Sequence, residues 1–477
     1  MTPDLALLLC CVFCVWVFRK DAQWHPGLSP ALWLPVLWIW RSASRDIGFW
    51  FHGGDPAAAD GTLYDPVFFT ICTVIGWGVL LRRNLNWSEI LRSNVWLFLF
   101  FGYMAISIFW TPDAFVGFKR WFRACGDLTI VLIVATNPGG QLEGLLTVLR
   151  RGAYLLVPFS IVLAKYFPDL GRSPGKHWQA DEWIGVATQK NDLGMLCMVM
   201  GLWLMWEFWH LRENREALPE REFKIRRGVV ALYAAMTLYL FNGGGTARSM
   251  TSIVTLLIGV ALFWQLATWL ENPSRFWQRI GVILGIWIVL QPGSQLLFGK
   301  SLYDMTLEAM GRNPTLTDRT MLWHDCFKLG MQQPILGAGY MGFWTDKVAT
   351  KIAVDNTNGP TEAHNGYLEV FLQLGAVGLM LFLPVIFSSL AKAWRLMRVD
   401  FDQGRFYVAI LVCMLVHNYT ESGFPRPNYL TWFVFLLAGV SGWRNALATS
   451  ELPDPDENEF EPADNYEPAQ KTPAVET

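Results

Sequence analysis

The sequence has few charged residues for its length. Of its 477 residues, 16% are Asp, Glu, Lys or Arg, whereas a soluble chain usually carries about 25%. Hydrophobic residues make up 53% of the chain, and the mean hydropathy is +0.28. This balance excludes an ordinary soluble domain and predicts a protein that crosses a membrane many times.

The eight cysteines form no recognisable site. Six of them lie within apolar runs, and the CxxC made by Cys11 and Cys14 has no second pair nearby. Zinc sites and redox centres need partner residues that these runs do not supply. The sequence therefore predicts neither a disulfide framework nor a cysteine metal site.

Motifs for metals and nucleotides are also missing. The chain has no HExxH motif, and the NGGGTARS stretch at 242–249 lacks the Lys-Ser/Thr ending of a phosphate-binding loop. We therefore expect no metal, no cofactor and no bound nucleotide.

The chain contains instead a series of apolar runs, most of them close to the length of about 20 residues that a membrane helix needs. They predict an all-α, polytopic membrane protein with about 12 transmembrane helices, or 13 if both of the first two runs cross. The candidate cores lie near residues 5–18, 28–40, 67–81, 94–110, 125–136, 152–167, 191–209, 228–241, 251–270, 279–291, 367–391, 406–418 and 429–442.

Basic loop residues orient these helices, because Lys and Arg favour the cytoplasmic side. The 210–227 connection carries six basic residues and is assigned to the inside, which also places Arg150, Arg151 and Lys392 on the inside. Four regions then lie outside: 111–124, 168–190, 242–250 and 292–366. We expect membrane helices over 1–290, a large periplasmic loop over 291–366, C-terminal membrane helices over 367–445 and an acidic disordered cytoplasmic tail over 446–477.

The outside regions contain cations such as Lys190, Arg248 and Arg319, against the usual topology preference. The planar fork of arginine suits phosphate oxygens, because paired N–H donors meet two oxygens at once. These cations therefore suggest an anion bound at the outer face, such as the pyrophosphate of a lipid-linked substrate. The alternative is that a few cations are tolerated on any loop.

The stretch AHNGYLEVFLQLGAVGLMLFLPVIF, residues 363–387, places polar residues at the start of a predicted membrane helix. Asn365, Glu369 and Gln373 are four residues apart and share one helix face. His364 lies at the predicted outer start of this helix, where a neutral imidazole could accept a proton from a hydroxyl. The alternative is a structural histidine that caps the helix.

A second His-Asn pair, His417 and Asn418, lies near the outer end of another apolar run, with Glu421 after it. These three residues are candidates for supporting the first pair. Packing within the helix bundle is the alternative.

The predicted external loop contains Arg319. Thr317 is suited to cap a helix that runs to Gly330, and Pro and Gly residues over 334–339 predict a turn after it. Arg319 falls in the first turn of this helix, where a cation opposes the helix dipole. We therefore expect it to meet an anionic ligand or a nearby carboxylate.

Four blocks of sequence carry a resemblance to a known family. TDRTMLW with PILGAGYMGFW, then HNGYLEVFLQLGAVGLMLFL, resemble the O-antigen ligase family, whose superfamily includes exopolysaccharide polymerases. GVATQKNDLG at 185–194 is similar to the family's Lys-Asn motif, and TARSMTS at 246–252 to its Ser/Thr-rich stretch. The blocks cover residues 185 to about 390 in the expected order.

This resemblance implies a bacterial inner-membrane enzyme with about a dozen helices and one large periplasmic loop. Such enzymes transfer a glycan from a polyprenyl-pyrophosphate carrier to an acceptor hydroxyl on the periplasmic side, without a nucleotide sugar. By resemblance, His364 is the general base, and Arg319 and Arg248 bind the pyrophosphate. Further assignments are Lys190 to the phosphate and Asn365 and Asn191 to support, with Glu369 either orienting His364 or acting as the base itself.

The expected partners are a lipid-linked glycan donor, a glycan or glycolipid acceptor, the membrane and other polysaccharide-assembly proteins, but no nucleic acid. A polymerase, in which one lipid-linked repeat accepts another, is an alternative that these blocks do not separate from a ligase. A transporter of lipid-linked oligosaccharide is an alternative from another class. It predicts ionisable residues at mid-membrane depth, whereas the candidate residues cluster at one face.

Overall fold

The computed structural model describes residues 1–51, 62–174, 181–243, 248–271, 274–275, 278–279, 281–282, 319–352 and 361–440. Almost all of the regular structure in these residues is α-helical. Among them, five helices are long and apolar enough to cross a membrane, and six if one bent pair counts as a span. The chain is therefore an all-α, multi-pass membrane protein, and the count of about 12 spans stays a prediction.

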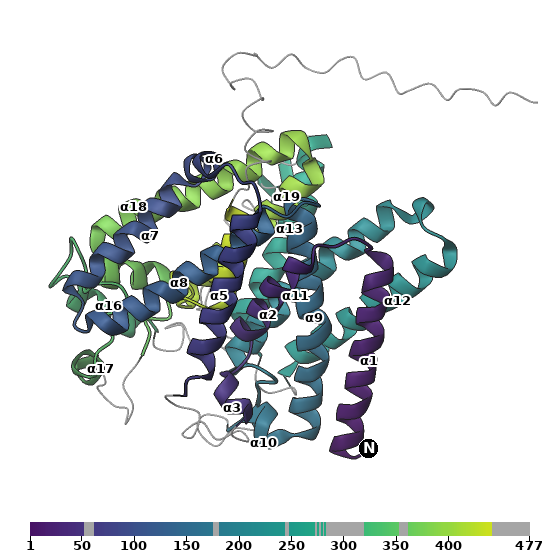
Figure 1. The fold of residues 1–477 in the computed structure, drawn as a ribbon, viewed down its shortest axis with the longest axis horizontal. Coiled ribbons are helices and arrows are strands. Elements are labelled where there is room, and N and C mark those ends of the chain that lie inside the picture. Colours follow the sequence, from purple (N-terminus) through teal and green to yellow (C-terminus); the bar gives the residue numbers. More distant parts are fainter. Residues whose placement is uncertain are drawn as a thin grey trace, which may run out of the picture.

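The N-terminal half forms helices across the whole width of Figure 1. In the order of the chain they are α1 (Pro3–Trp24), η1 (Pro30–Leu32), α2 (Trp33–Ser42), α3 (Ile47–Phe51), α5 (Tyr64–Arg82), α6 (Trp87–Ser93), α7 (Val95–Ser107), η2 (Ile108–Trp110), α8 (Ala114–Ala135), α9 (Gln141–Tyr166), α10 (Pro168–Gly171), α11 (Lys190–Glu213), η4 (Arg215–Ala217) and α12 (Glu220–Phe241). Two short strands, β1 (Arg172–Ser173) and β2 (Glu182–Trp183), pair antiparallel before α11.

The C-terminal half supplies α13 (Met250–Glu271), α16 (Arg319–Gly330), α17 (Asp346–Ile352), α18 (Gly366–Val399), α19 (Phe401–Thr420) and α20 (Leu430–Gly439). α18 packs against both α19 and α7, and Figure 1 shows α7 and α18 lying obliquely beside each other. α9 and α11 are the most enclosed of the candidate spans, whereas only a minority of the residues of α5 and α13 is buried. The exposed apolar residues of α5 and α13 are the surface expected to face lipid.

Every predicted apolar core except 279–291, which lies largely outside the described residues, falls on one or more helices. Several helices begin before the apolar core does, and some of them are capped by a polar side chain. Asp113 accepts a hydrogen bond from the amide of Val116 at the start of α8, and Asp400 does so from Gln403 at the start of α19.

Arg150 and Arg151 lie within a helix and not in a loop between two predicted spans, and their assignment to the inside stays a prediction. Both residues lie within α9, at 3% and 7% exposure, and both form ion pairs with the fully buried carboxylate of Asp21 on α1. The pair of cations is compatible with the helix interior because Asp21 offers one oxygen to each guanidinium. α8 also begins before its predicted apolar core. Lys119, predicted in an outside loop, lies in its second turn.

α18 is broken at Gly375, where φ is 64° and ψ is −162°. The turn formed by residues 334–338 lies against this break and replaces the missing helical hydrogen bonds: the amide of Ala376 donates to Pro334 and that of Ala338 donates to Leu372. Gly337, with φ of 70°, packs directly on the backbone of Gln373. The predicted turn over 334–339 is confirmed.

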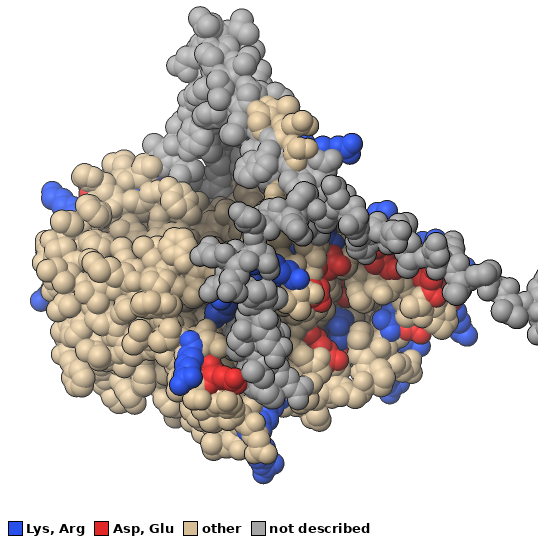
Figure 2. All heavy atoms as spheres, turned by 90° about the horizontal axis from the view of Figure 1, so that it is seen from above, with Lys and Arg blue, Asp and Glu red and all other residues tan. Residues whose placement is uncertain are grey.

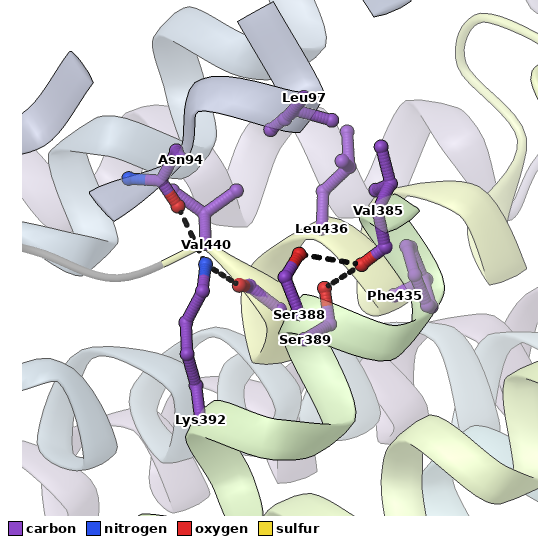
Figure 3. Close-up of a pocket in the computed structure, with 10 residues that line it drawn as sticks. Asn94, Leu97, Val385, Ser388, Ser389, Lys392, Phe435, Leu436 and Val440 are labelled. Atoms are coloured by element: carbon purple, nitrogen blue, oxygen red, sulfur yellow. Dashed lines mark hydrogen bonds between the residues drawn. The ribbon is translucent and has the colours of Figure 1, made fainter. Parts of the chain in front are cut away.

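The far end of α18 contains Lys392, whose ammonium donates to Asn94 Oδ1 (2.9 Å) and to the carbonyl of Gly439 (3.0 Å). It thereby caps the last carbonyl of α20 and lines a small pocket between α7, α18 and α20 (Figure 3). Ser389 in the same pocket donates to the carbonyl of Val385. The polar groups of this pocket satisfy one another, so it offers no obvious site for chemistry.

Figure 2 looks down on the molecule from the top of Figure 1, the end where α18 gives way to α19. Charged side chains gather over the half of this face that lies toward α12, and the opposite half is almost uniformly uncharged. The exposed basic residues of the α11–α12 connection include Arg212, Arg215 and Lys224. The orientation inferred from loop charges stays a prediction.

Candidate functional site

The carboxylate of Glu421, just after α19, brings together residues from three distant parts of the chain. Its Oε1 accepts hydrogen bonds from Arg319 Nη2 (3.0 Å) and Asn191 Nδ2 (3.1 Å). Its Oε2 lies 3.4 Å from His364 Nδ1. Glu421 is only 2% exposed, and Arg319 also donates to the carbonyl of Thr420. Three of the predicted site residues therefore meet at one buried anion.

His364 lies between two carboxylates. Its Nδ1 is 3.2 Å from Glu362 Oε1, in addition to its contact with Glu421, and its side chain is 32% exposed. The other oxygen of Glu362 accepts from Arg426 Nη1 at 2.8 Å. Arg319, Glu421, His364, Glu362 and Arg426 thus form a continuous chain of alternating charge around an imidazole, here named the five-residue cluster.

The position of His364 is fixed by the start of α18. Asn365 is the N-cap: its side chain accepts hydrogen bonds of 3.0 Å from the amides of Tyr367 and Leu368. The amide of Asn365 donates to Ser422 Oγ (3.1 Å), next to Glu421. His364 has a φ of 50°, a left-handed conformation that is uncommon for a residue other than glycine. An unusual backbone held by several bonds is often found at functional sites.

Glu369 lies one helical turn below His364 and supports the same loop. Its carboxylate accepts from the amide of Ala363 (2.7 Å), from Trp344 Nε1 (2.9 Å) and from Gln373 Nε2 (2.9 Å). At 4% exposure it is closely surrounded by these donors. The bond from Gln373 confirms that the two residues share a helix face. This arrangement fits a residue that positions the His364 loop better than one that takes a proton from substrate.

The Lys-Asn-Asp sequence that opens α11 contributes to the site in three directions. Lys190 forms an ion pair with Glu182 on β2 (2.5 Å), and Asn191 donates to Glu421 as above. Asp192 accepts from the Tyr429 hydroxyl at 3.3 Å. The first turn of α11 therefore links the five-residue cluster to the loop that precedes α20.

Arg248 lies at the start of α13 and is exposed, with Nη2 donating to Asn242 Oδ1 (2.8 Å). Its neighbours along the chain reach α19: Ser252 Oγ lies 3.3 Å from His417 Nε2. Thr251 lies 3.4 Å from Thr420 through their hydroxyls. The Ser/Thr-rich stretch thus packs against the end of α19 that carries Glu421, whereas Arg248 itself contacts Asn242.

The pKa of Glu421 is held below its usual value. Burial alone would raise it, but the hydrogen bond with His364 and the positive charge of Arg319 more than offset that effect. Glu421 is therefore a carboxylate near neutral pH. Because a carboxylate accepts hydrogen bonds and does not donate them, the imidazole must supply the proton of this contact from Nδ1.

Glu362, His364 and Glu421 are a group, among the described residues, whose ligand atoms lie within 4.8 Å of one another, close enough to hold a metal ion. Each of the two carboxylates already has an arginine beside it. The arrangement is suited to proton transfer at His364 and to binding of anionic oxygen atoms.

Glu362 and Arg426 were not expected from the sequence. Glu362 stands two residues before His364, and its proximity was a usable signal, but an acidic residue in a polar loop is too common to single out. Arg426 lies 62 positions beyond His364 in the chain. Only the packing of the loop after α19 against the start of α18 brings it to the site.

Residues 193–383 match the family model described as O-Antigen ligase. The chain contains an O-antigen ligase region. This region begins just inside α11 and ends within α18, so that it includes Arg248, Arg319, His364 and Glu369. Glu421, which ties these elements together, lies beyond it.

Curated relatives of the chain extend the likeness beyond the O-antigen ligase region. The exopolysaccharide production protein ExoQ of Rhizobium meliloti (strain 1021) is 23% identical over 359 residues, which is 73% of this chain and 77% of ExoQ. A putative polysaccharide ligase of Rickettsia felis is 28% identical over 204 residues, or 40% of this chain and 47% of that protein. A putative polysaccharide ligase of Rickettsia conorii is 28% identical over 184 residues, 37% and 42% of the two chains.

These findings confirm the resemblance read from the sequence blocks. The protein is a multi-pass membrane protein that contains an O-antigen ligase region and is similar to proteins of exopolysaccharide production and to putative polysaccharide ligases. The family indicates an enzyme that transfers glycosyl groups, as a ligase or as a polymerase.

Proposed function

We propose that this protein is an inner-membrane glycosyltransferase that moves a glycan from a polyprenyl-pyrophosphate carrier to an acceptor hydroxyl at the periplasmic face. The observation that carries the proposal is the five-residue cluster, in which an imidazole lies between two carboxylates and two arginines. The O-antigen ligase region supports the class of reaction. The topology assumed is the one read from loop charges, with about 12 spans and the 291–366 loop in the periplasm.

His364 is the general base in this scheme. Its Nδ1 is engaged by Glu421 and Glu362, so Nε2 is the ring nitrogen left to accept the proton of the acceptor hydroxyl. The carboxylates fix the tautomer and stabilise the imidazolium that forms, as in other carboxylate–histidine pairs. Glu369 accepts a hydrogen bond from the amide of Ala363, the residue before His364, and does not take the proton.

The sugar is transferred in a single displacement at the anomeric carbon. The acceptor oxygen forms a bond to the anomeric carbon, and its proton moves to His364 Nε2. The bond between that carbon and the pyrophosphate oxygen breaks, and the electron pair leaves with the carrier. Arg319, beside Glu421, is placed to offset the charge that develops on the pyrophosphate. Arg248 and Lys190 are assigned to the same anion because they lie on the segments that border the cluster.

A polymerase of lipid-linked repeat units is the second candidate. The relative that aligns with most of this chain is an exopolysaccharide production protein, whereas the polysaccharide ligases align with less than half of it. Donor chemistry would be identical, and only the acceptor would differ. Transport of the lipid-linked oligosaccharide is a third possibility, against which the position of the cluster at helix ends argues.

The test is a transfer assay with the full chain in lipid nanodiscs. The donor is a polyprenyl-pyrophosphate-linked oligosaccharide, a membrane extract supplies acceptors, and release of free polyprenyl pyrophosphate is followed. We expect release by the wild type, and at least a ~100-fold decrease for His364→Ala. The control, Arg215→Ala, changes an exposed arginine of the α11–α12 connection and should behave as the wild type.

The products then separate the candidates. Glycan growth on the carrier identifies a polymerase, and glycan on another molecule identifies a ligase. Movement of the lipid across the bilayer without any release of polyprenyl pyrophosphate would replace the transferase with a transporter. Equal activity of wild type and His364→Ala would remove His364 from the role of base.

A further inference from the structure

The two arginines of the five-residue cluster differ in what they have left to offer a ligand. Arg319 is 14% exposed, and its two terminal nitrogens bond to Glu421 and to the carbonyl of Thr420. Arg426 is 48% exposed. Among the described residues, the hydrogen bonds of its guanidinium involve Nη1 and Glu362 alone. A guanidinium has five N–H donors, so Arg426 presents the larger unused set.

Arg426 is also held in place. Its guanidinium lies 5.1 Å from the centre of the Tyr429 ring, and the Tyr429 hydroxyl donates to Asp192 on α11. Its backbone amide donates to Gly423. The stacking and the ion pair with Glu362 orient the fork without using its remaining donors. A pre-oriented, exposed arginine has less to lose in side-chain freedom when an anion binds.

The position of Arg426 relative to His364 also supports a role in ligand binding. Arg319 and Arg426 are each linked to His364 through a separate carboxylate, Glu421 for Arg319 and Glu362 for Arg426. An ion pair as exposed as Glu362 with Arg426 contributes little to stability. A role in the fold alone therefore gives little reason to place an arginine there.

We propose that Arg426 is a further anion-binding residue of the site, and that it takes an oxygen atom of the carrier's pyrophosphate. The inference rests on the proposed function only in the identity of the ligand. A sugar carboxylate offers the same chemistry as a phosphate oxygen, and the two sources are separated by the probes used below. In this scheme Arg426 supplies the exposed end of the anion site, and Arg319 supplies its buried end.

The experiment measures binding and needs no transfer. Full-length protein in nanodiscs is titrated with polyprenyl pyrophosphate that carries no glycan, and separately with glucuronic acid. We expect Arg426→Ala to weaken binding of polyprenyl pyrophosphate about ten-fold or more, as the loss of a charge-assisted hydrogen bond requires. Arg215→Ala is the matched control, because Arg215 also lies over an aromatic ring, that of Phe223 at 5.6 Å.

A double variant separates ligand binding from charge balance. Arg426→Ala leaves Glu362 without its arginine partner, so Glu362→Gln with Arg426→Ala removes both charges of the ion pair together. The proposal expects the double variant to bind as weakly as Arg426→Ala. Recovery of wild-type affinity in the double variant would overturn it, since the arginine would then serve only to neutralise Glu362.

The remaining outcomes are also decisive. Weakened binding of glucuronic acid alone would support an anion site whose ligand is an acidic sugar. Unchanged binding of both probes by Arg426→Ala, with weakened binding by Arg319→Ala, would refute the role of Arg426 and leave the proposed function standing. No binding of polyprenyl pyrophosphate by the wild type would refute both.

Discussion

Asn191, in the first turn of α11, donates a 3.1 Å hydrogen bond to Glu421, which follows α19 in the chain 230 residues later. The same carboxylate is bonded to Arg319 and lies beside His364. One buried anion therefore fixes the relative positions of a proposed base, a proposed pyrophosphate ligand and the helix that begins with the Lys-Asn motif.

Glu421→Gln is expected to slow glycan transfer about 10–100-fold, because the neutral amide no longer stabilises the imidazolium formed when His364 accepts a proton. The acidic limb of the pH–rate profile should move to lower pH for the same reason. Glu421→Asp keeps the charge and should recover part of the rate. Steady-state transfer assays between pH 5 and 9 measure both effects. A Glu421→Gln enzyme with a slower rate but an unshifted profile would show that the residue serves the fold alone.

The lowered pKa of Glu421 also predicts a dependence of stability on pH. A carboxylate whose pKa is lower in the folded state stabilises the fold above its unfolded pKa, about 4.3 for Glu, and loses this contribution as the pH falls through the folded value. The wild type should therefore lose stability on acidification below about pH 5 more steeply than Glu421→Gln.

Thermal unfolding in nanodiscs from pH 3 to 7 tests this difference. The control is Glu220→Gln, which removes a carboxylate that is 62% exposed and paired with Lys224. It should follow the wild-type curve. Parallel curves for wild type and Glu421→Gln would mean that the carboxylate does not gain from its partners in the folded state.

Gly375→Ala is expected to destabilise the protein although it adds only a methyl group. The residue has a positive φ, and a Cβ atom there would lie 2.2 Å from the carbonyl oxygen of Ile335. The turn over 334–338 would have to move away from the break in α18. A decrease in thermal stability of several degrees is expected from strain of this kind. Gly102→Ala is the control, because a Cβ at Gly102 on α7 meets nothing within 4 Å.

The sequence predicted the helical class and most helix positions, because hydropathy and the length of apolar runs are local properties. It also identified His364, Arg319 and Asn191, which the structure brings to one carboxylate. Their roles stay predictions. Arg319 was expected to contact either an anionic ligand or a nearby carboxylate. It forms an ion pair with a carboxylate, but the partner is Glu421 and not a residue of its own loop.

What the sequence could not supply depends on contacts between distant segments. Arg150 and Arg151 looked like loop cations because nothing in their own stretch reveals that Asp21 pairs with both. The break in α18 was hidden for a similar reason. Gly375 reads as a helix-packing glycine until the turn over 334–338 is seen to supply the replacement hydrogen bonds.

The ion pairs of Asp21 give the most direct test of how charge is accommodated in the bundle. Asp21→Asn keeps the shape of the side chain but leaves two arginines buried without a counter-charge. Removing one partner from a buried ion pair costs about 3–5 kcal/mol, because the remaining charge is neither solvated nor paired. An exposed pair such as Lys224 with Glu220 is worth about 0–1 kcal/mol.

Denaturant unfolding of Asp21→Asn and Glu220→Gln in the same detergent therefore compares the loss of a buried carboxylate with the loss of an exposed one. The first variant should unfold far more readily, and the second should match the wild type. A triple variant, with Asp21→Asn, Arg150→Met and Arg151→Met, should recover much of the lost stability, since apolar replacement of a buried ion network is often neutral. If Asp21→Asn alone were as stable as the wild type, the two arginines would have to be solvated at this position, and α9 could not be enclosed there as the structure shows.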